Sequence, residues 1–234
     1  MTVVGSLKVI AIDGPAGAGK STIARRLARA LNLEYLDTGA MYRAVTAIAL
    51  HRGLDIHDES LVGPLSREID IEEGLEAVTA DGIDVTAFIR GPEVTGAVST
   101  VAAMSSVRQE MRERQRRWGE ARGGGVIEGR DIGTVVFPDA ILKVFLTASP
   151  RVRAERRVAE IGGDVEVIER TIRERDLKDS SRSDSPLVES NDSVTVDTSN
   201  HSIDDVVSRI TVLLTERDAE RGIPRLAEDR NAEQ

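Results

Sequence analysis

The chain contains no cysteine and only 3 histidines among its 234 residues. The absence of cysteine excludes a disulfide framework, a thiolate nucleophile and a cysteine metal site, and so few histidines argue against a histidine-rich metal cluster. We interpret the histidines, which are scattered in polar surroundings, as surface residues: His51, His57 and His201. Aromatic residues are 3% of the chain, so the core must consist mainly of Val, Ile, Leu and Ala.

The chain also lacks a long apolar run and an excess of basic residues. No apolar segment approaches the roughly 20 residues that span a bilayer, and no basic leader with an apolar core precedes the first apolar segment. We therefore expect a cytoplasmic protein with no membrane partner. The 40 acidic residues outnumber the 31 basic ones and give a net charge of −9, which argues against broad binding to a nucleic-acid backbone. This length suits one α/β domain with a small insertion.

A glycine-rich segment, Gly14 to Thr22, fits the pattern G-x-x-x-x-G-K-[ST] and follows the apolar run Leu7 to Ile12. In such a loop the backbone N–H groups surround phosphates, Lys20 reaches the terminal phosphates, and the Ser21 hydroxyl binds a phosphate-bound magnesium ion. The alternative is a strand-to-helix turn with no ligand. The predicted ATP site consists of Gly14, Pro15, Ala16, Gly17, Ala18, Gly19, Lys20, Ser21 and Thr22.

Apolar strands alternate with amphipathic helices along most of the chain, which predicts an α/β fold with a parallel sheet covered on both faces. The predicted strands are Leu7–Ile12, Glu34–Leu36, Gly125–Ile127, Ile141–Leu146 and Val194–Val196. The predicted helices are Lys20–Leu31, Ala40–His51, Val107–Arg122, Pro150–Ile161, Val165–Asp176 and Ser202–Arg221.

Two segments interrupt this alternation. Residues 69–96 are acidic and contain short alternating runs between turn-like pairs, which predicts a small β insertion. Residues 177–191 are rich in Ser and Asp, as in a mobile lid. The predicted organisation is a core of residues 1–68 and 97–222 with a lid at about 175–191, an insertion at 69–96, and a charged, frayed tail at 223–234.

A phosphate-binding loop alone does not distinguish a GTPase switch, an ATP-driven machine and a small-molecule kinase. No guanine-reading Asn-Lys-x-Asp segment is present, which disfavours the switch. Arginines lie at or near the ends of the expected elements, and phosphoryl transfer needs such positioned, permanently charged groups. They are Arg43, Arg108, Arg130, Arg175 and Arg182. Solvated helix faces are the alternative, which we favour for Arg112, Arg173 and the basic run 112–117.

Three further segments resemble the bacterial cytidylate kinases, and the resemblance covers nearly the whole chain. They are Asp37–Arg43 (DTGAMYR), Glu128–Ala140 (EGRDIGTVVFPDA) and Arg175–Arg182 (RDLKDSSR). The resemblance implies ATP-dependent phosphorylation of CMP and dCMP in pyrimidine nucleotide metabolism, with magnesium. It also implies a P-loop kinase fold with a five-stranded parallel sheet, a nucleoside monophosphate (NMP) binding insertion and a short lid.

The resemblance assigns roles to individual residues. Ser99, Arg108 and Asp131 correspond to the cytosine-reading groups, and this fits the chemistry because cytosine presents an amino donor where uracil presents an acceptor. Thr38, Arg43 and Arg130 correspond to acceptor-phosphate contacts, and Asp179 to the ribose contact. Arg175 and Arg182 correspond to lid arginines that meet the phosphates, so the catalytic set is Lys20, Arg130, Arg175 and Arg182. Arg157, or its neighbour Arg156, could stack near the adenine of ATP or simply lie on an outward helix face.

Several alternatives stay open at this point. The acceptor could be UMP, AMP or shikimate, and the protein could instead be a nucleotide-dependent switch that binds a partner through the β insertion. Asp37 and Thr38 could merely cap the helix that follows them, and Asp131 could be an ordinary turn carboxylate. We favour a monomeric kinase that binds ATP and CMP or dCMP and binds no nucleic acid.

Overall fold

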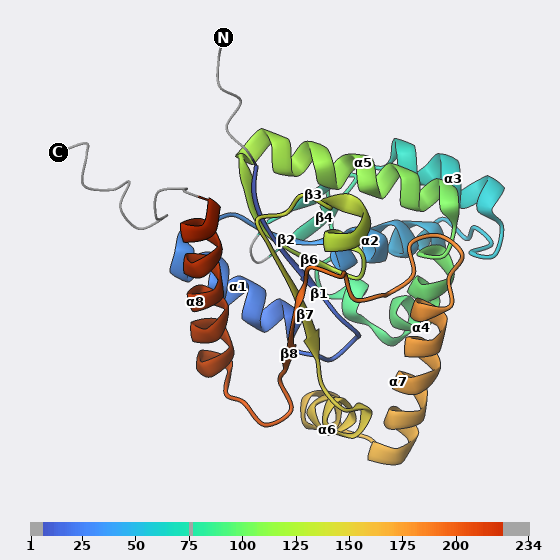
Figure 1. Ribbon diagram of the computed structural model, residues 1–234. Helices are drawn as coiled ribbons and strands as arrows, with labels where there is room; N and C mark the ends of the chain where they lie inside the picture. Colours follow the sequence, from blue (N-terminus) through green and yellow to red (C-terminus); the bar gives the residue numbers. More distant parts are fainter. Residues whose placement is uncertain (1–6, 75–76, 222–234) are drawn as a thin grey trace, which may run out of the picture.

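The computed structural model describes residues 7–74 and 77–221 (Figure 1). Five strands form the main sheet: β1 (Lys8–Asp13), β2 (Tyr35–Asp37), β6 (Gly124–Gly129), β7 (Leu142–Thr147) and β8 (Val194–Asp197). Three short strands form a second sheet: β3 (Ile71–Glu73), β4 (Val78–Ala80) and β5 (Ile83–Asp84). The helices are α1 (Lys20–Leu31), α2 (Thr38–His51), α3 (Glu59–Glu68), α4 (Pro92–Val101), α5 (Ser105–Arg122), α6 (Pro150–Ile161), α7 (Val165–Ser180) and α8 (Ile203–Arg221).

The main sheet is entirely parallel and has the order β2-β6-β1-β7-β8. The predicted fold class is therefore confirmed. The central strand β1 pairs with β6 on one side, where Asp13 lies opposite Gly129, and with β7 on the other, where Asp13 lies opposite Phe145. In a parallel sheet the ligand site forms beyond the carboxyl ends of the strands, at the point where the chain order changes direction. That point is the carboxyl end of β1.

Two apolar clusters cover the two faces of the sheet, as Figure 1 shows by placing α1 and α8 on one side and α2, α3 and α5 on the other. The α1/α8 cluster includes Ile10 and Leu27, whereas the opposite cluster includes Ala11 and Met111. Neighbouring residues of β1 thus point to opposite faces, and both are buried. This explains the continuous apolar run that predicted the strand.

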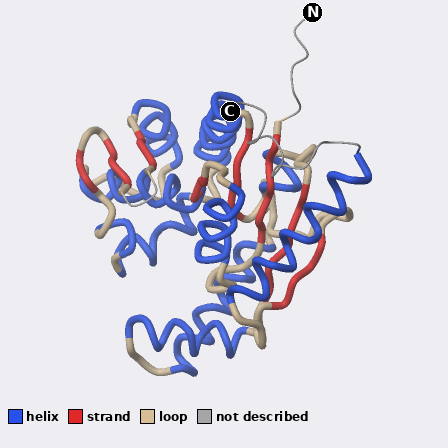
Figure 2. The backbone as a smooth tube through the Cα atoms, turned by 90° about the vertical axis from the view of Figure 1, so that its left-hand side faces the viewer, coloured by secondary structure: helices blue, strands red, loops and turns tan. Residues whose placement is uncertain are grey.

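The small antiparallel sheet β3-β4-β5 lies apart from the main sheet, as seen in Figure 2. It falls within the predicted β insertion at 69–96. The sequence did not predict its flanking helices α3 and α4. Helix α3 contains Pro64, and α4 carries the β-branched residues Val94, Thr95, Val98 and Thr100, so both have weak local helical signals. Packing against the rest of the fold therefore stabilises these two helices, which have low intrinsic helix propensity.

Two predicted helices, Lys20–Leu31 and Pro150–Ile161, have the predicted bounds. Helix α7 continues to Ser180, beyond the predicted end at Asp176, so the first part of the predicted lid is helical. All three histidines are exposed, as predicted. The predicted tail at 223–234 lies outside the described residues. Within residues 7–74 and 77–221, no helix is both long enough and apolar enough to cross a membrane.

Candidate active site

The phosphate-binding loop joins β1 to α1 and is bound to its own lysine. The Lys20 ammonium donates to the Pro15 carbonyl oxygen at 2.9 Å, and the side chain is buried. Burial, and next the charge of Arg130, lower the pKa of Lys20 to about 7. Gly14 has a φ of 146°, and a Cβ there would lie 2.0 Å from the Leu146 carbonyl oxygen, so only glycine fits.

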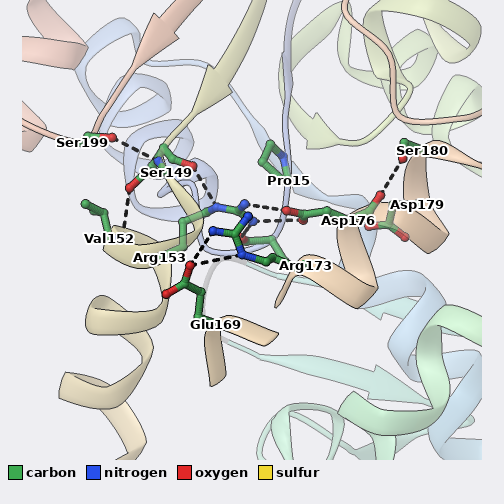
Figure 3. Close-up of polar contacts among 12 residues, drawn as sticks. Pro15, Ser149, Val152, Arg153, Glu169, Arg173, Asp176, Asp179, Ser180 and Ser199 are labelled. Carbon is green, nitrogen blue, oxygen red and sulfur yellow. Dashed lines mark hydrogen bonds and ion pairs between the residues drawn. The ribbon is translucent and has the colours of Figure 1, made fainter. Parts of the chain in front are cut away.

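Two side chains from other elements hold the carbonyl groups of this loop. Arg153 of α6 donates to the Ala16 carbonyl oxygen at 3.0 Å, and the Thr198 hydroxyl donates to that of Ala18 at 3.1 Å. Arg153 is 3% exposed and also pairs with Asp176 of α7, at 3.0 and 2.5 Å. Figure 3 shows the Arg153 guanidinium facing Asp176. Arg153 therefore links the loop to the helix that carries Arg175, a link that the sequence did not reveal.

Carboxylates gather where β2 and β6 end. Glu128 accepts a hydrogen bond from the Tyr35 hydroxyl, and Asp37 caps α2 by accepting from the Ala40 N–H at 3.1 Å. Burial and the charge of Asp37 raise the pKa of Glu128 to about 6, although the charge of Lys20 and the hydrogen bond from Tyr35 oppose this shift. Asp37 therefore caps α2.

The same edge receives a carboxylate from the small sheet. Glu73 of β3 accepts from the Asp37 N–H at 2.7 Å, and burial and the charge of Asp37 raise its pKa. Thr38, a predicted phosphate contact, donates its hydroxyl to the Glu128 carbonyl oxygen at 2.7 Å. The structure thus places Thr38 beside the site as a link between α2 and β6.

Asp13, the last residue of β1, is a functional candidate that the sequence analysis missed. Its carboxylate accepts from the N–H groups of Ile132 and Gly133 at 2.9 and 2.7 Å, and burial raises its pKa to about 6. These bonds hold the π-helical turn Ile132–Val136 directly after Arg130 and Asp131. The sequence does contain a signal for this residue, because Asp13 is a carboxylate that directly follows the apolar run Val9 to Ile12.

Four of the predicted arginines come together on the carboxyl side of the sheet. Charge interactions connect Arg43, Arg130, Arg175 and Arg182 with one another or with Asp179. Arg130 pairs with Asp179 at 3.0 Å, and Asp179 is 5% exposed. Among the described residues, the other three arginines form no ion pair with a carboxylate.

These arginines retain free hydrogen-bond donors. Arg43 donates to the Ile89 carbonyl oxygen at 2.9 Å and to the Thr95 hydroxyl at 3.0 Å, and burial lowers its pKa. Within the described part of the chain, the Nε atoms of Arg175 and Arg182 are buried and have no partner. Burial, and next Arg130, lower the pKa of Arg175 to about 10. Half-buried cations that have no carboxylate partner and converge on one place fit an anionic ligand with several oxygens.

A second pair lies beside this cationic group. Arg108 of α5 is 1% exposed, and its Nη2 lies 2.6 Å from a carboxylate oxygen of Asp131. The guanidinium stacks over the Tyr42 ring at 5.6 Å from its centre. Asp131 is therefore no ordinary turn carboxylate. Ser99, the third predicted cytosine contact, is half-buried on α4.

The remaining arginines divide into surface and structural residues. Arg157 forms a 3.0 Å ion pair with Glu160 of its own helix and is 40% exposed, which leaves the predicted contact with adenine untested. Arg156 instead donates to Thr198, at 3.0 and 2.6 Å. Arg173 pairs with Glu169 on the surface of α7, as Figure 3 shows and as the sequence predicted.

The interpretation of residues 112–117 as a solvated helix face is wrong for Arg112 and Arg114, which are half-buried, whereas Arg116 and Arg117 are exposed as predicted. Arg112 contacts Asp184 at 2.7 Å, Arg114 donates to the Ser66 carbonyl oxygen at 3.1 Å, and Arg116 donates to that of Val135 at 2.9 Å. Each of these three side chains joins α5 to a segment distant in the sequence. A long cationic side chain can reach such partners, and the helical periodicity of the sequence does not reveal them.

The glycine-rich loop at the end of β1, the parallel sheet of order β2-β6-β1-β7-β8 and the facing arginines define a P-loop kinase fold. A solved structure of an uncharacterized protein from Eubacterium ventriosum has a similar fold: it is 11% identical, has a TM-score of 0.53, and is matched over 88% of this chain and 98% of that one. At that identity the likeness concerns the fold alone.

The chain belongs to the cytidylate kinase family, because the profile of that family matches residues 10–216. The cytidylate kinase of Desulforamulus reducens is 49% identical over 211 residues, which are 87% of this chain and 95% of the relative. That of Streptomyces avermitilis is 45% identical over 217 residues, 90% and 94% of the two chains. The bifunctional pantoate ligase/cytidylate kinase of Nostoc is 50% identical over 215 residues, but these are 86% of this chain and only 40% of that protein.

Proposed function

We propose that the chain transfers the terminal phosphoryl group of ATP to CMP and dCMP and produces ADP and the corresponding diphosphate. One observation carries the proposal: the buried Arg108–Asp131 pair adjoins a group of arginines with free donors. A nucleoside monophosphate has the matching shape, with an uncharged base at one end and a phosphate at the other. The membership of the family supports cytosine as the base.

The residues of the site position the two nucleotides and neutralise charge. The phosphate-binding loop and Lys20 hold the terminal phosphates of ATP, while Arg43 and Arg130 hold the phosphate of the acceptor. Arg175 and Arg182 neutralise the charge that spreads over the oxygens of the migrating group. No strong general base is needed, because the attacking oxygen already belongs to an ionised phosphate. Burial of the site excludes water and so limits wasteful hydrolysis of ATP.

Cytosine recognition rests on Arg108, Asp131 and Ser99. The Asp131 carboxylate can accept from the exocyclic amino group of cytosine, and the free donors of Arg108 can meet the ring acceptors. Uracil has a hydrogen-bond acceptor at the position of that amino group. Its oxygen would face the Asp131 carboxylate, and neither group would have a donor. Asp179, which is buried beside Arg130, would accept from a ribose hydroxyl.

The donor set near the phosphate-binding loop fits magnesium. Ser21, at the start of α1, and Glu128, near the end of β6, supply a hydroxyl and a carboxylate, and magnesium prefers such oxygen ligands. No cluster of three or more acidic or histidine side chains for a metal is present in residues 7–74 and 77–221, so phosphate oxygens would supply most other ligands. When bound, the ion neutralises phosphate charge.

The remaining parts of the proposal concern organisation. The chain would act as a monomer, because one chain supplies both ends of the site. Residues 69–96 would form the NMP-binding insertion and residues 175–191 the lid, on a core of residues 1–68 and 97–222. The Glu73 contact with the Asp37 N–H supports a link between the insertion and the sheet edge.

The test is a coupled assay of ADP release with CMP, dCMP, UMP, AMP and shikimate as acceptors. The proposal predicts the highest kcat/KM for CMP and dCMP, and little ADP release without an acceptor. A preference for UMP would contradict the roles of Ser99, Arg108 and Asp131. Steady ATP hydrolysis that CMP does not change would instead favour a nucleotide-dependent switch.

A further inference from the structure

A charged residue outside the proposed contacts lies beside the base-reading pair. Arg108 and Arg112 are four residues apart on α5 and therefore project from the same side of the helix. Between them lies Asp184, from the segment after α7. One of its carboxylate oxygens is 2.7 Å from Arg112 Nη1, 2.7 Å from the Ser185 hydroxyl and 3.7 Å from Arg108 Nε.

Arg108 needs such a neighbour, because its guanidinium is buried and only partly paired. Its Nη2 contacts Asp131, and its Nη1 donates to the Ala102 carbonyl oxygen at 3.1 Å. Its Nε has no hydrogen-bond partner among the described residues. A buried, unpaired donor is costly, and a shift of the Asp184 carboxylate from 3.7 Å to hydrogen-bond distance would satisfy it. Burial raises the pKa of Asp184, but hydrogen bonds from Ser185 and Arg112 lower it overall, so the group is ionised at neutral pH.

The charges within this ion-pair network also balance. Two cations, Arg108 and Arg112, face two carboxylates, Asp131 and Asp184. In contrast, among the described residues only one of the four arginines at the phosphate end, Arg130, forms an ion pair with a carboxylate, that of Asp179. An uncharged base fits a buried, neutral environment, since a net buried charge there would lack a counter-charge. Asp184 supplies one of the two negative charges that neutralise Arg108 and Arg112.

We propose that Asp184 is a specificity-determining positioning residue. Together with Asp131 it fixes the Arg108 guanidinium so that the remaining donors meet the cytosine ring, while Arg112 holds Asp184 in place. This inference rests on the proposed function. Asp184 lies after α7, within the proposed lid of residues 175–191. Recognition of the base therefore also depends on the position of the lid.

The first test is Asp184→Asn in the full chain, with steady-state kinetics for CMP and UMP at saturating ATP. We expect the KM for CMP to rise about tenfold, equivalent to about 1.4 kcal/mol, with little change in kcat or in the KM for ATP. The ratio of kcat/KM between CMP and UMP falls by about the same factor. Asp184→Glu, which keeps the charge, restores most of the loss. The matched control is Asp192→Asn, which removes a carboxylate from the ion pair with Lys143 and leaves all these values unchanged.

A charge exchange separates positioning of Arg108 from simple attachment of the segment to α5. The double variant Arg112→Asp, Asp184→Arg restores an ion pair between the two positions but places a cation opposite Arg108. We expect its KM for CMP to remain at least as high as that of Asp184→Asn. Recovery of the wild-type KM in the double variant would overturn the inference, as would an unchanged KM and CMP/UMP ratio in Asp184→Asn. Failure of the wild-type chain to phosphorylate CMP would instead overturn the proposed function.

Discussion

The buried environment of Lys20 predicts that the binding of ATP is accompanied by the uptake of a proton. The amine is buried beside Arg130, and its pKa is lowered to about 7. At about pH 8 such an amine is about nine-tenths neutral, whereas a neighbouring triphosphate favours the charged form. The binding of ATP should therefore take up about 0.9 proton per molecule at that pH. Asp13 and Glu128, whose pKa values are raised to about 6, are already ionised there and should not contribute.

The assay is isothermal titration calorimetry of ATP binding at about pH 8, in buffers with different ionisation enthalpies. The slope of the observed enthalpy against the buffer enthalpy gives the number of protons taken up, which we expect to be about 0.9. Lys20→Arg is the control, since an arginine at that position stays charged and its slope should fall to near zero. A slope near zero in the wild-type chain would refute the argument, because Lys20 would then already carry its proton.

Two further predictions concern the fold and the cationic group. Arg182→Ala should lower kcat about a hundredfold to a thousandfold with an unchanged melting temperature, whereas Arg173→Ala, on the exposed face of α7, should leave kcat unchanged; equal rates in the two variants would exclude Arg182 from catalysis. Gly14→Ala would force its Cβ to 2.0 Å from the Leu146 carbonyl oxygen and should destabilise the fold by about 4 kcal/mol or more in urea unfolding. Gly53→Ala, with a positive φ of 67° but open space around it, should cost only about 1 kcal/mol, and similar losses in both would contradict the role of the close contact.

Much of the fold could be predicted from the sequence because its signals are local. The apolar face of Lys20–Leu31 predicted the whole of α1, and the helix at Pro150–Ile161 begins with a proline directly after the capping residue Ser149. The glycine pattern located the phosphate site because the required backbone geometry depends on residue type. Helices α3 and α4 had weaker local signals, and their packing against α5 and α2 forms only in the folded chain.

The parts of the site that could not be predicted are contacts between distant residues. Arg153 and Asp176 look like ordinary charges on helix surfaces, yet they join the phosphate-binding loop to α7. Arg112 and Asp184 are 72 positions apart, and no periodic pattern connects them. Asp13 lies one residue beyond the predicted strand and received no role, although its carboxylate supports the turn after β6. Polar contacts of this kind depend on the tertiary fold rather than on local sequence.

The most direct measurement of the central claim is a crystal structure of the chain with CMP and a non-hydrolysable ATP analogue. The account predicts the cytosine base against Arg108 and Asp131, with its phosphate between Arg43 and Arg130 and facing the terminal phosphate held by Lys20. A cytidine nucleotide bound elsewhere, or one whose phosphate points away from Lys20, would contradict it.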